Sequence, residues 1–229
     1  MAIAEMSIPA LLRNQATTQG DAVAYTFMDA AVLGSGHPES LTWSQLHRRV
    51  LALAEELRRC ASAGDRAAIL APQGLDYIVS FFGAMQAGLV AVPLSVPQFG
   101  AHDERVASVL EDSAPSVVLT TSAVVADVNK YARPHGGRPA PAVIEVDLID
   151  VDVTRDLDDT DHSHPGPAYL QYTSGSTRSP AGVVVSHQNV IANIEQVVRD
   201  YFGDDPAALE VTTVVSWLPF FHDLGLVMG

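Results

Sequence analysis

A loop rich in hydroxyl groups is the part of this sequence best suited to chemistry. Residues 173–183 read Thr-Ser-Gly-Ser-Thr-Arg-Ser-Pro-Ala-Gly-Val and lie between two apolar stretches. Gly175 lets the backbone come close to a ligand, and consecutive N–H groups together with hydroxyls can bind a phosphate group. A Walker A loop is excluded, because it would end in Gly-Lys-Ser/Thr. A Ser/Thr/Gly-rich hairpin turn without a ligand is the alternative interpretation.

A second segment further along the chain carries a histidine among apolar residues. Residues 217–226 read Trp-Leu-Pro-Phe-Phe-His-Asp-Leu-Gly-Leu. His222 can orient an anionic substrate by hydrogen bonding, although a lone histidine in an apolar segment is more often a satisfied core residue. We expect Asp223 to orient His222 or to cap the next helix. Three aromatic side chains could line an apolar channel or simply fill the core: Trp217, Phe220 and Phe221.

The two segments, in this order and at this spacing, resemble the adenylate-forming enzymes, which make acyl-AMP from a carboxylic acid and ATP. Members of that superfamily usually have Gly where this chain has Arg178, and Lys where it has Ala181. The variant found here is similar to that of the fatty-acyl-AMP ligases. Further matches to that group make the resemblance cover nearly the whole chain; they are residues 41–46 (LTWSQL), 71–75 (APQGL), 92–97 (VPLSVP) and 185–190 (VSHQNV).

The resemblance implies a reaction in which a carboxylate attacks the α-phosphate of ATP and releases pyrophosphate. Such a reaction depends on positioning and charge stabilisation. Position in the matched motif assigns the phosphate contacts to Thr173, Ser174, Gly175, Ser176 and Thr177. Arg178 either adds a cation there or faces solvent. His222 is the catalytic candidate, as a hydrogen-bonding group and not a general base, because a fatty carboxylate is already ionised. The cofactors implied are ATP and Mg²⁺, and Mg²⁺ gains importance because Ala181 replaces the usual lysine.

The resemblance also implies partners and a longer protein. The substrate would be a long-chain fatty acid, and the acyl group would pass to an acyl carrier protein or polyketide synthase for lipid biosynthesis. Two alternatives stay open, an acyl-CoA synthetase and a non-catalytic module that binds nucleotide or a carrier protein. The family's adenine, ribose and Mg²⁺ motifs and its catalytic lysine would lie beyond residue 229. We therefore expect an N-terminal fragment that is inactive alone, from a parent more than twice as long.

Composition limits the class of partner. The formal net charge is −14, and a single lysine, Lys130, stands beside twelve arginines. This balance argues against nucleic acid or an anionic membrane, since both require basic patches. Cys60 is the only cysteine, so no intrachain disulfide forms, and we expect it to be structural. The composition suits a reducing cytoplasm.

Neither a secretory signal nor a membrane span is expected. The first residues lack the basic start and apolar core of a signal peptide. The apolar stretch 78–96 is interrupted by Ser80, Gln86, Gly88 and Pro93. It is better explained as a buried helix over residues 75–87 followed by a buried strand over 89–94.

Strand and helix patterns alternate along the chain and predict an α/β fold. The sheet should be largely parallel, with helices covering its faces. Ser7 should cap a helix ending at residue 16, and Thr42 with Gln45 forms a capping box. Further helices are expected at residues 43–60, 75–87, 103–113, from 122 onward, and 186–201. Strands are expected at residues 23–28, 66–70, 89–94, 116–120, 142–146, 168–172, 182–185 and 211–217.

An acidic segment divides the sequence. Residues 147–161 contain seven aspartates and one arginine, and we expect a solvated linker. His162 and His164 in such a segment are more often surface residues than metal ligands. The family resemblance implies that residues 66–205 form an α/β subdomain. It also implies that residues 1–62 with 209–229 begin a second one, and that the C-terminal domain is absent.

Overall fold

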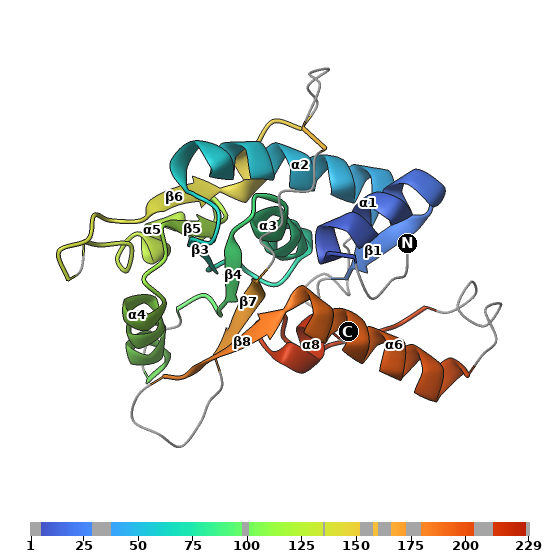
Figure 1. Ribbon diagram of the computed structural model, residues 1–229. Helices are drawn as coiled ribbons and strands as arrows, with labels where there is room; N and C mark the ends of the chain where they lie inside the picture. Colours follow the sequence, from blue (N-terminus) through green and yellow to red (C-terminus); the bar gives the residue numbers. More distant parts are fainter. Residues whose placement is uncertain are drawn as a thin grey trace.

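A six-stranded sheet forms the centre of the molecule (Figure 1). The computed structural model describes residues 6–28, 38–97, 101–134, 136–151, 158–159, 166–172, 180–203 and 213–227. The sheet has the order β6-β5-β3-β4-β7-β8, and every pair is parallel except β7 and β8. Its strands are β3 (Arg66–Ile69), β4 (Val90–Pro93), β5 (Val117–Thr120), β6 (Ala142–Glu145), β7 (Pro167–Tyr172) and β8 (Gly182–Ser186). The predicted largely parallel α/β sheet is confirmed.

Helices cover both faces of this sheet. The first face carries α1 (Ile8–Thr18), α2 (Trp43–Cys60) and α3 (Leu75–Gln86), and the second carries α4 (Ala101–Ser113) and α5 (Val125–Val128). A separate antiparallel pair joins β1 (Val23–Phe27) to β2 (Glu39–Thr42). The remaining elements are the short 3₁₀ helix η3 (Val146–Leu148), α6 (His187–Phe202) and α8 (Asp223–Val227).

The alternation of side chains along β3 explains the two-sided core. Ala67 and Ile69 pack with residues of α2 and α3, whereas Ala68 and Leu70 pack with residues of α4. All four are fully buried. Successive side chains in a strand point to opposite faces, so a strand covered on both sides has to be apolar throughout.

Local capping chemistry sets where the helices begin. The Ser7 hydroxyl accepts from the Ala10 N–H at 3.0 Å, which caps α1. Thr42 and Gln45 form the predicted capping box, at 3.2 Å and 2.9 Å, and α2 spans residues 43–60 as expected. Ser186 caps α6 through a second capping box. Each cap satisfies N–H groups that the first helical turn leaves unpaired.

Two predicted elements differ in the structure. The helix expected from residue 122 begins at Val125 and has four residues. The reason is that the Ser122 N–H donates to Asp147 Oδ1 at 2.8 Å, which holds residue 122 in a turn. Residues 213–217, expected to be a strand, pair with no strand among the described residues, and Val215 is 83% exposed. Residues 211 and 212 lie outside the described part of the chain.

The described part of the acidic segment is attached to the helices instead of being fully solvated. Arg13 donates to the Asp159 carbonyl at 2.8 Å, and Arg58 lies 3.5 Å from Asp158. His47 Nε2 lies 3.2 Å from the Asp159 carboxylate. Residues 158 and 159 therefore lie against α1 and α2, where Asp158 pairs with the Arg58 guanidinium and the Asp159 carbonyl accepts from Arg13.

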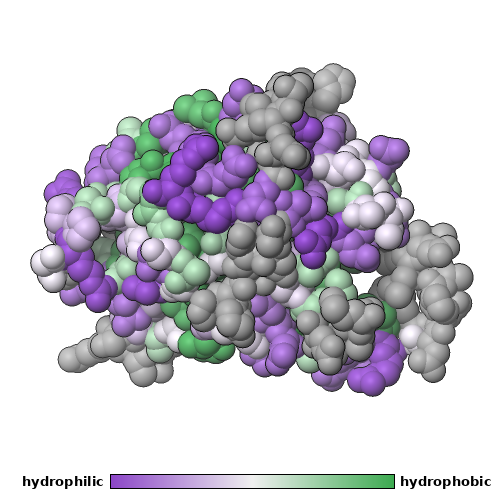
Figure 2. Space-filling model, turned by 45° about the horizontal axis from the view of Figure 1, so that its top comes forward, coloured by the Kyte–Doolittle hydropathy of each residue, from purple (hydrophilic) through white to green (hydrophobic). Residues whose placement is uncertain are grey.

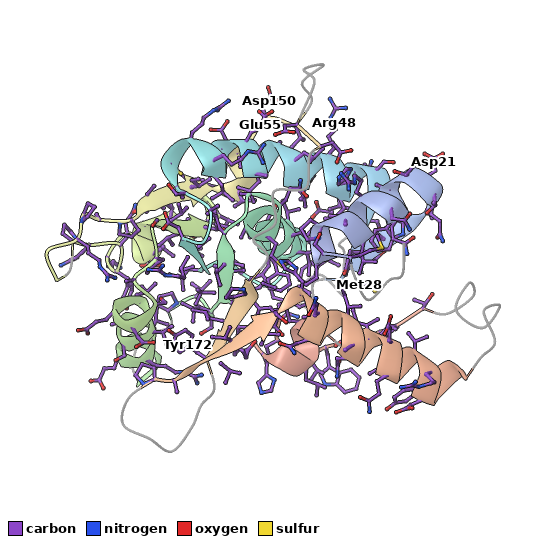
Figure 3. The ribbon with its side chains drawn as sticks, viewed as in Figure 1. Asp21, Met28, Arg48, Glu55, Asp150 and Tyr172 are labelled. Atoms are coloured by element: carbon purple, nitrogen blue, oxygen red, sulfur yellow. The ribbon has the colours of Figure 1, made fainter. Side chains whose placement is uncertain are left out.

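The outer side of α2 is charged. Figure 3 shows Arg48 and Glu55 on this side of the helix, near Asp150. Arg48 Nε donates to the Val151 carbonyl at 2.9 Å. Figure 2, in which the top of Figure 1 comes forward, shows hydrophilic residues across the middle of this face with smaller hydrophobic groups between them. Among the described residues no helix is long and apolar enough to cross a membrane.

Candidate functional site

The segment that we call the hydroxyl loop, residues 173–181, connects the two strands of an antiparallel hairpin. Tyr172 at the end of β7 pairs with Gly182 at the start of β8, so these two residues close the connection. The connection leaves the sheet at the carboxyl end of β7, and open α/β sheets bind ligands outside the carboxyl ends of their strands. The predicted phosphate contacts lie outside the described residues, and so does Arg178; they are Thr173, Ser174, Gly175, Ser176 and Thr177.

The first end of this connection is tied to α4. The buried Tyr172 hydroxyl donates to Asp112 Oδ2 at 2.5 Å, and Arg105 Nη2 donates to the Tyr172 carbonyl at 3.3 Å. Burial raises the pKa of Tyr172 above its usual range, and the hydrogen bond to Asp112 raises it further. Figure 3 labels Tyr172 at this end of the hairpin, beside α4. The phenol is therefore a neutral hydrogen-bond donor.

The strand before the loop also contacts the second motif segment. Gln171 Nε2 donates to the Phe221 carbonyl at 3.0 Å. Gln171 lies two residues before Thr173, and Phe221 directly precedes His222. The structure thus brings together the flanks of two segments that the sequence separates by many residues. Our sequence analysis did not identify Gln171, although a glutamine inside an otherwise apolar strand was a signal that could have found it.

The segment before α8 is held through its backbone and one aromatic ring. Gln73 Nε2 donates to the Leu218 carbonyl at 3.1 Å. The Phe220 ring packs against the Tyr77 ring of α3, with centroids 5.7 Å apart. These contacts place residues 218–221 against the first face of the sheet. The sequence analysis did not identify Gln73 as a contact of this segment.

His222 lies at the exposed start of α8. Its backbone N–H donates to the Pro219 carbonyl at 3.1 Å. Its ring nitrogen Nδ1 accepts from the Leu224 backbone N–H at 3.4 Å. A neutral imidazole whose Nδ1 accepts carries its proton on Nε2. His222 directly precedes α8 and caps its first turn, a role that the sequence analysis gave to Asp223 as one of two possibilities. The Asp223 side chain lies outside the described part of the structure. An Nε2–H donor suits hydrogen bonding to an anionic substrate.

Gly225 permits close packing of α8 on the segment before it. A Cβ atom added at Gly225 would lie 2.2 Å from the Pro219 carbonyl oxygen and 2.8 Å from the Pro219 carbonyl carbon. Both contacts are shorter than side chains tolerate, and both involve backbone, which cannot simply rotate away. The glycine of this motif is therefore required for space.

The aromatic residues of the motif have different environments. Phe220 is half-buried on Tyr77, whereas Trp217 is 86% exposed and Phe221 is 40% exposed. A cavity of about 620 Å³ lies elsewhere, between the end of α4 and residues 130–141. None of the motif aromatics lines this cavity, and the acyl channel stays a prediction.

Two further predictions concern metal and thiol chemistry. Within the described ranges, no three His, Cys, Asp or Glu residues cluster as metal ligands would. His162 and His164 fall outside those ranges. The Cys60 thiol donates to the Leu57 carbonyl at 3.4 Å, and burial raises its pKa. A raised pKa disfavours the reactive thiolate, which supports a structural role.

Comparison with known proteins finds similarity along the whole chain. A family model described as AMP-binding enzyme matches residues 12–229. The long-chain-fatty-acid–AMP ligase FadD26 of Mycobacterium tuberculosis is 56% identical over 229 residues, which are all of this chain and 39% of that protein. A 4-hydroxyphenylalkanoate adenylyltransferase of Mycobacterium marinum is 54% identical, and the match covers 37% of it. The chain thus spans about two fifths of the length of these relatives.

Solved structures agree with the sequence relatives. A fatty acid AMP ligase from Legionella pneumophila matches 99% of this chain and 37% of its own, with a TM-score of 0.81 and 28% identity. A fatty acyl-adenylate ligase from the same organism, in complex with acyl adenylate and pyrophosphate, matches 99% of this chain and 38% of its own, with a TM-score of 0.80 and 28% identity. The family model covers residues 12–229 and so includes both motif segments: the chain belongs to the AMP-binding enzyme family.

Proposed function

We propose that the full-length protein activates a long-chain fatty acid with ATP, giving acyl-AMP and pyrophosphate. The observation that carries this proposal is the hydrogen bond from Gln171 to the Phe221 carbonyl. It sets the strand entering the hydroxyl loop beside the segment that carries His222, so one site can hold a triphosphate and a carboxylate together. The FadD26 relative, named as a long-chain-fatty-acid–AMP ligase, supports the choice of acid.

The reaction requires no proton transfer from the protein. A carboxylate oxygen of the fatty acid attacks the α-phosphorus of ATP, and the bond to the bridging oxygen breaks as pyrophosphate leaves. The carboxylate is already ionised near neutral pH, because carboxyl pKa values lie at about 4. His222 then acts through its Nε2–H, which donates to the carboxylate and later to the acyl phosphate. Its contribution is orientation and charge stabilisation.

We propose that the hydroxyl loop holds the departing pyrophosphate through Thr173, Ser174, Gly175, Ser176 and Thr177. Hydroxyl and backbone N–H donors suit phosphate oxygens. Ala181 offers no charge, so Mg²⁺ would supply the positive charge that the leaving group needs.

We further propose that the acyl group passes to the phosphopantetheine thiol of an acyl carrier protein or polyketide synthase, in the cytoplasm, where ATP is supplied. The support is the loop variant with Arg178 and Ala181, which is similar to that of the fatty-acyl-AMP ligases. This part of the proposal rests on family similarity.

The internal division is also a proposal. Residues 66–205 would form one α/β subdomain, and residues 1–62 with 209–229 would begin another. The support is the family resemblance. In this chain α1 and α2 share one core with α3, so a boundary near residue 64 would separate parts of a continuously packed unit.

The test uses the full-length protein with a long-chain fatty acid, ATP and Mg²⁺. We expect acid-dependent exchange of pyrophosphate into ATP. Adding CoA should leave acyl-AMP in place, whereas adding a carrier protein that bears phosphopantetheine should consume it. Absence of exchange would refute adenylation. Efficient formation of acyl-CoA would instead identify an acyl-CoA synthetase and refute the carrier step.

A further inference from the structure

We propose that Tyr172 and Asp112 are positioning residues that fix the ends of the hydroxyl loop and so set the affinity for ATP. This inference rests on the proposed function for its effect on ATP, but its geometry stands on the described residues alone. Together with Gly182 they form what we call the loop clamp, defined as Tyr172, Asp112 and Gly182. All three lie outside the segment assigned to phosphate contact.

The first half of the clamp fixes the residue before the loop. Tyr172 is 5% exposed, and its hydroxyl donates to Asp112 in the last turn of α4. Its carbonyl accepts from Arg105, two turns earlier on the same helix. A hydrogen bond to a charged partner is stronger than one between neutral groups. Helix α4 therefore holds both the side chain and the carbonyl of Tyr172, in addition to the pairing of Tyr172 with Gly182 in the sheet.

The second half of the clamp fixes the residue after the loop. A Cβ atom added at Gly182 would lie 2.9 Å from Tyr172 Cζ and 3.1 Å from Tyr172 Oη. The phenol ring thus crosses directly over the Gly182 α-carbon on its way to Asp112. Gly182 does not need a left-handed backbone here. Its role is to leave space for the ring, so the two ends of the loop pack against each other.

The helix that holds the clamp is itself fixed to the sheet. Arg66, the first residue of β3, donates from Nε to the Ser113 carbonyl at 2.7 Å and from Nη2 to the Ala114 carbonyl at 3.1 Å. Val106 and Val109 bury the inner side of α4. Carbonyls at a helix C-terminus lack partners within the helix, and an arginine suits them in charge and geometry. The clamp is thus connected to a central strand of the sheet.

This arrangement has a specific consequence for binding. Donors of a loop bind phosphate well when they are already in place, because ordering a loose segment costs conformational entropy. A clamp that holds both ends reduces that cost for ATP. The hydrogen bonds of Tyr172 run to α4, whereas the segment around His222 is held through Gln171 and Gln73. We therefore expect the clamp to change the affinity for ATP more than the affinity for the fatty acid. A purely structural role would instead lower the amount of active enzyme without changing the KM for ATP.

The experiment compares Asp112→Ala, Tyr172→Phe and the double variant in the full-length protein. We expect each single variant to raise the KM for ATP about tenfold in pyrophosphate exchange, as the loss of one charged hydrogen bond would. The double variant should be no worse than either single one, because both remove the same bond. Asp112→Asn keeps an acceptor oxygen but loses the charge, so its KM for ATP should lie between those of wild type and Asp112→Ala. Asp147→Ala is the matched control, since Asp147 also accepts from a hydroxyl but follows β6, at the edge of the sheet opposite β8.

A second measurement does not depend on activity. Trypsin can cleave after Arg178, inside the loop, and we expect the Asp112→Ala and Tyr172→Phe proteins to be cut there faster than wild type and Asp147→Ala. An unchanged KM for ATP in an active enzyme, additive effects of the two changes, or unchanged cleavage at Arg178 would overturn the clamp. A wild-type protein without acid-dependent exchange would refute the proposed function instead, and the cleavage rates would then decide the clamp alone.

Discussion

Replacing Gly225 with alanine tests whether the packing of α8 positions His222. The added Cβ would lie 2.2 Å from the Pro219 carbonyl oxygen, which is roughly 1 Å short of an ordinary contact between such atoms. Because Pro219 also accepts from the His222 N–H at 3.1 Å, relief of this overlap has to move the start of α8 relative to residue 219. A displacement of about 1 Å at a reacting group can reduce the rate about 100-fold.

The assay is acid-dependent pyrophosphate exchange in the full-length protein, measured beside the thermal unfolding midpoint. Overpacking of this kind costs about 1–3 kcal/mol of folding free energy, so we expect a moderately lower midpoint and a much lower kcat. Gly74→Ala is the matched control. A Cβ at Gly74 would meet only the Phe27 ring, at 3.9 Å, and the backbone there is extended.

The outcome separates packing from chemistry. Wild-type exchange in Gly225→Ala would refute the reasoning, because it would show that the His222 segment tolerates the shift. A loss of activity that the Gly74→Ala control shares would refute it as well, since the effect would then follow from removing any glycine in this region.

Three further outcomes are expected. His222→Ala should lower pyrophosphate exchange in the full-length protein by about 10- to 100-fold, because it removes a hydrogen bond to a charged group. The unfolding midpoint should change little, because His222 is exposed. Wild-type exchange in this variant would contradict the role of His222. Burial lowers the pKa of His47, against the opposing effect of Asp159, so its stabilising contribution should be complete above about pH 6.5 and be lost as pH falls below that value. Unfolding midpoints between about pH 5 and 8 should show this slope, and His47→Leu should reduce it. The 229-residue chain alone should show no exchange, since it spans 39% of its FadD26 relative, and robust exchange would contradict this.

Local chemistry in the sequence determined most of the secondary structure. The capping box of Thr42 and Gln45 places the start of α2 correctly because it acts over three residues. Alternating apolar stretches and turn residues predicted the strands of the parallel sheet, since burial on both faces requires them. The two motif segments also predicted the family, which the family model and the relatives confirm. The roles of Thr173, Ser174, Gly175, Ser176, Thr177 and His222 stay predictions.

Contacts between distant segments were decided only by the tertiary structure. Tyr172 meets Asp112, and Gln171 meets Phe221, because helix α4 and the segment before α8 pack beside β7, and no pattern within one segment encodes that arrangement. The late start of α5 also depends on a distant residue, because the Ser122 N–H donates to the Asp147 carboxylate, 25 residues further along the chain. The sequence shows a glycine at position 182 but not its reason. Its α-carbon has to pass under the Tyr172 ring, a constraint of space that exists only once the two ends of the loop have met.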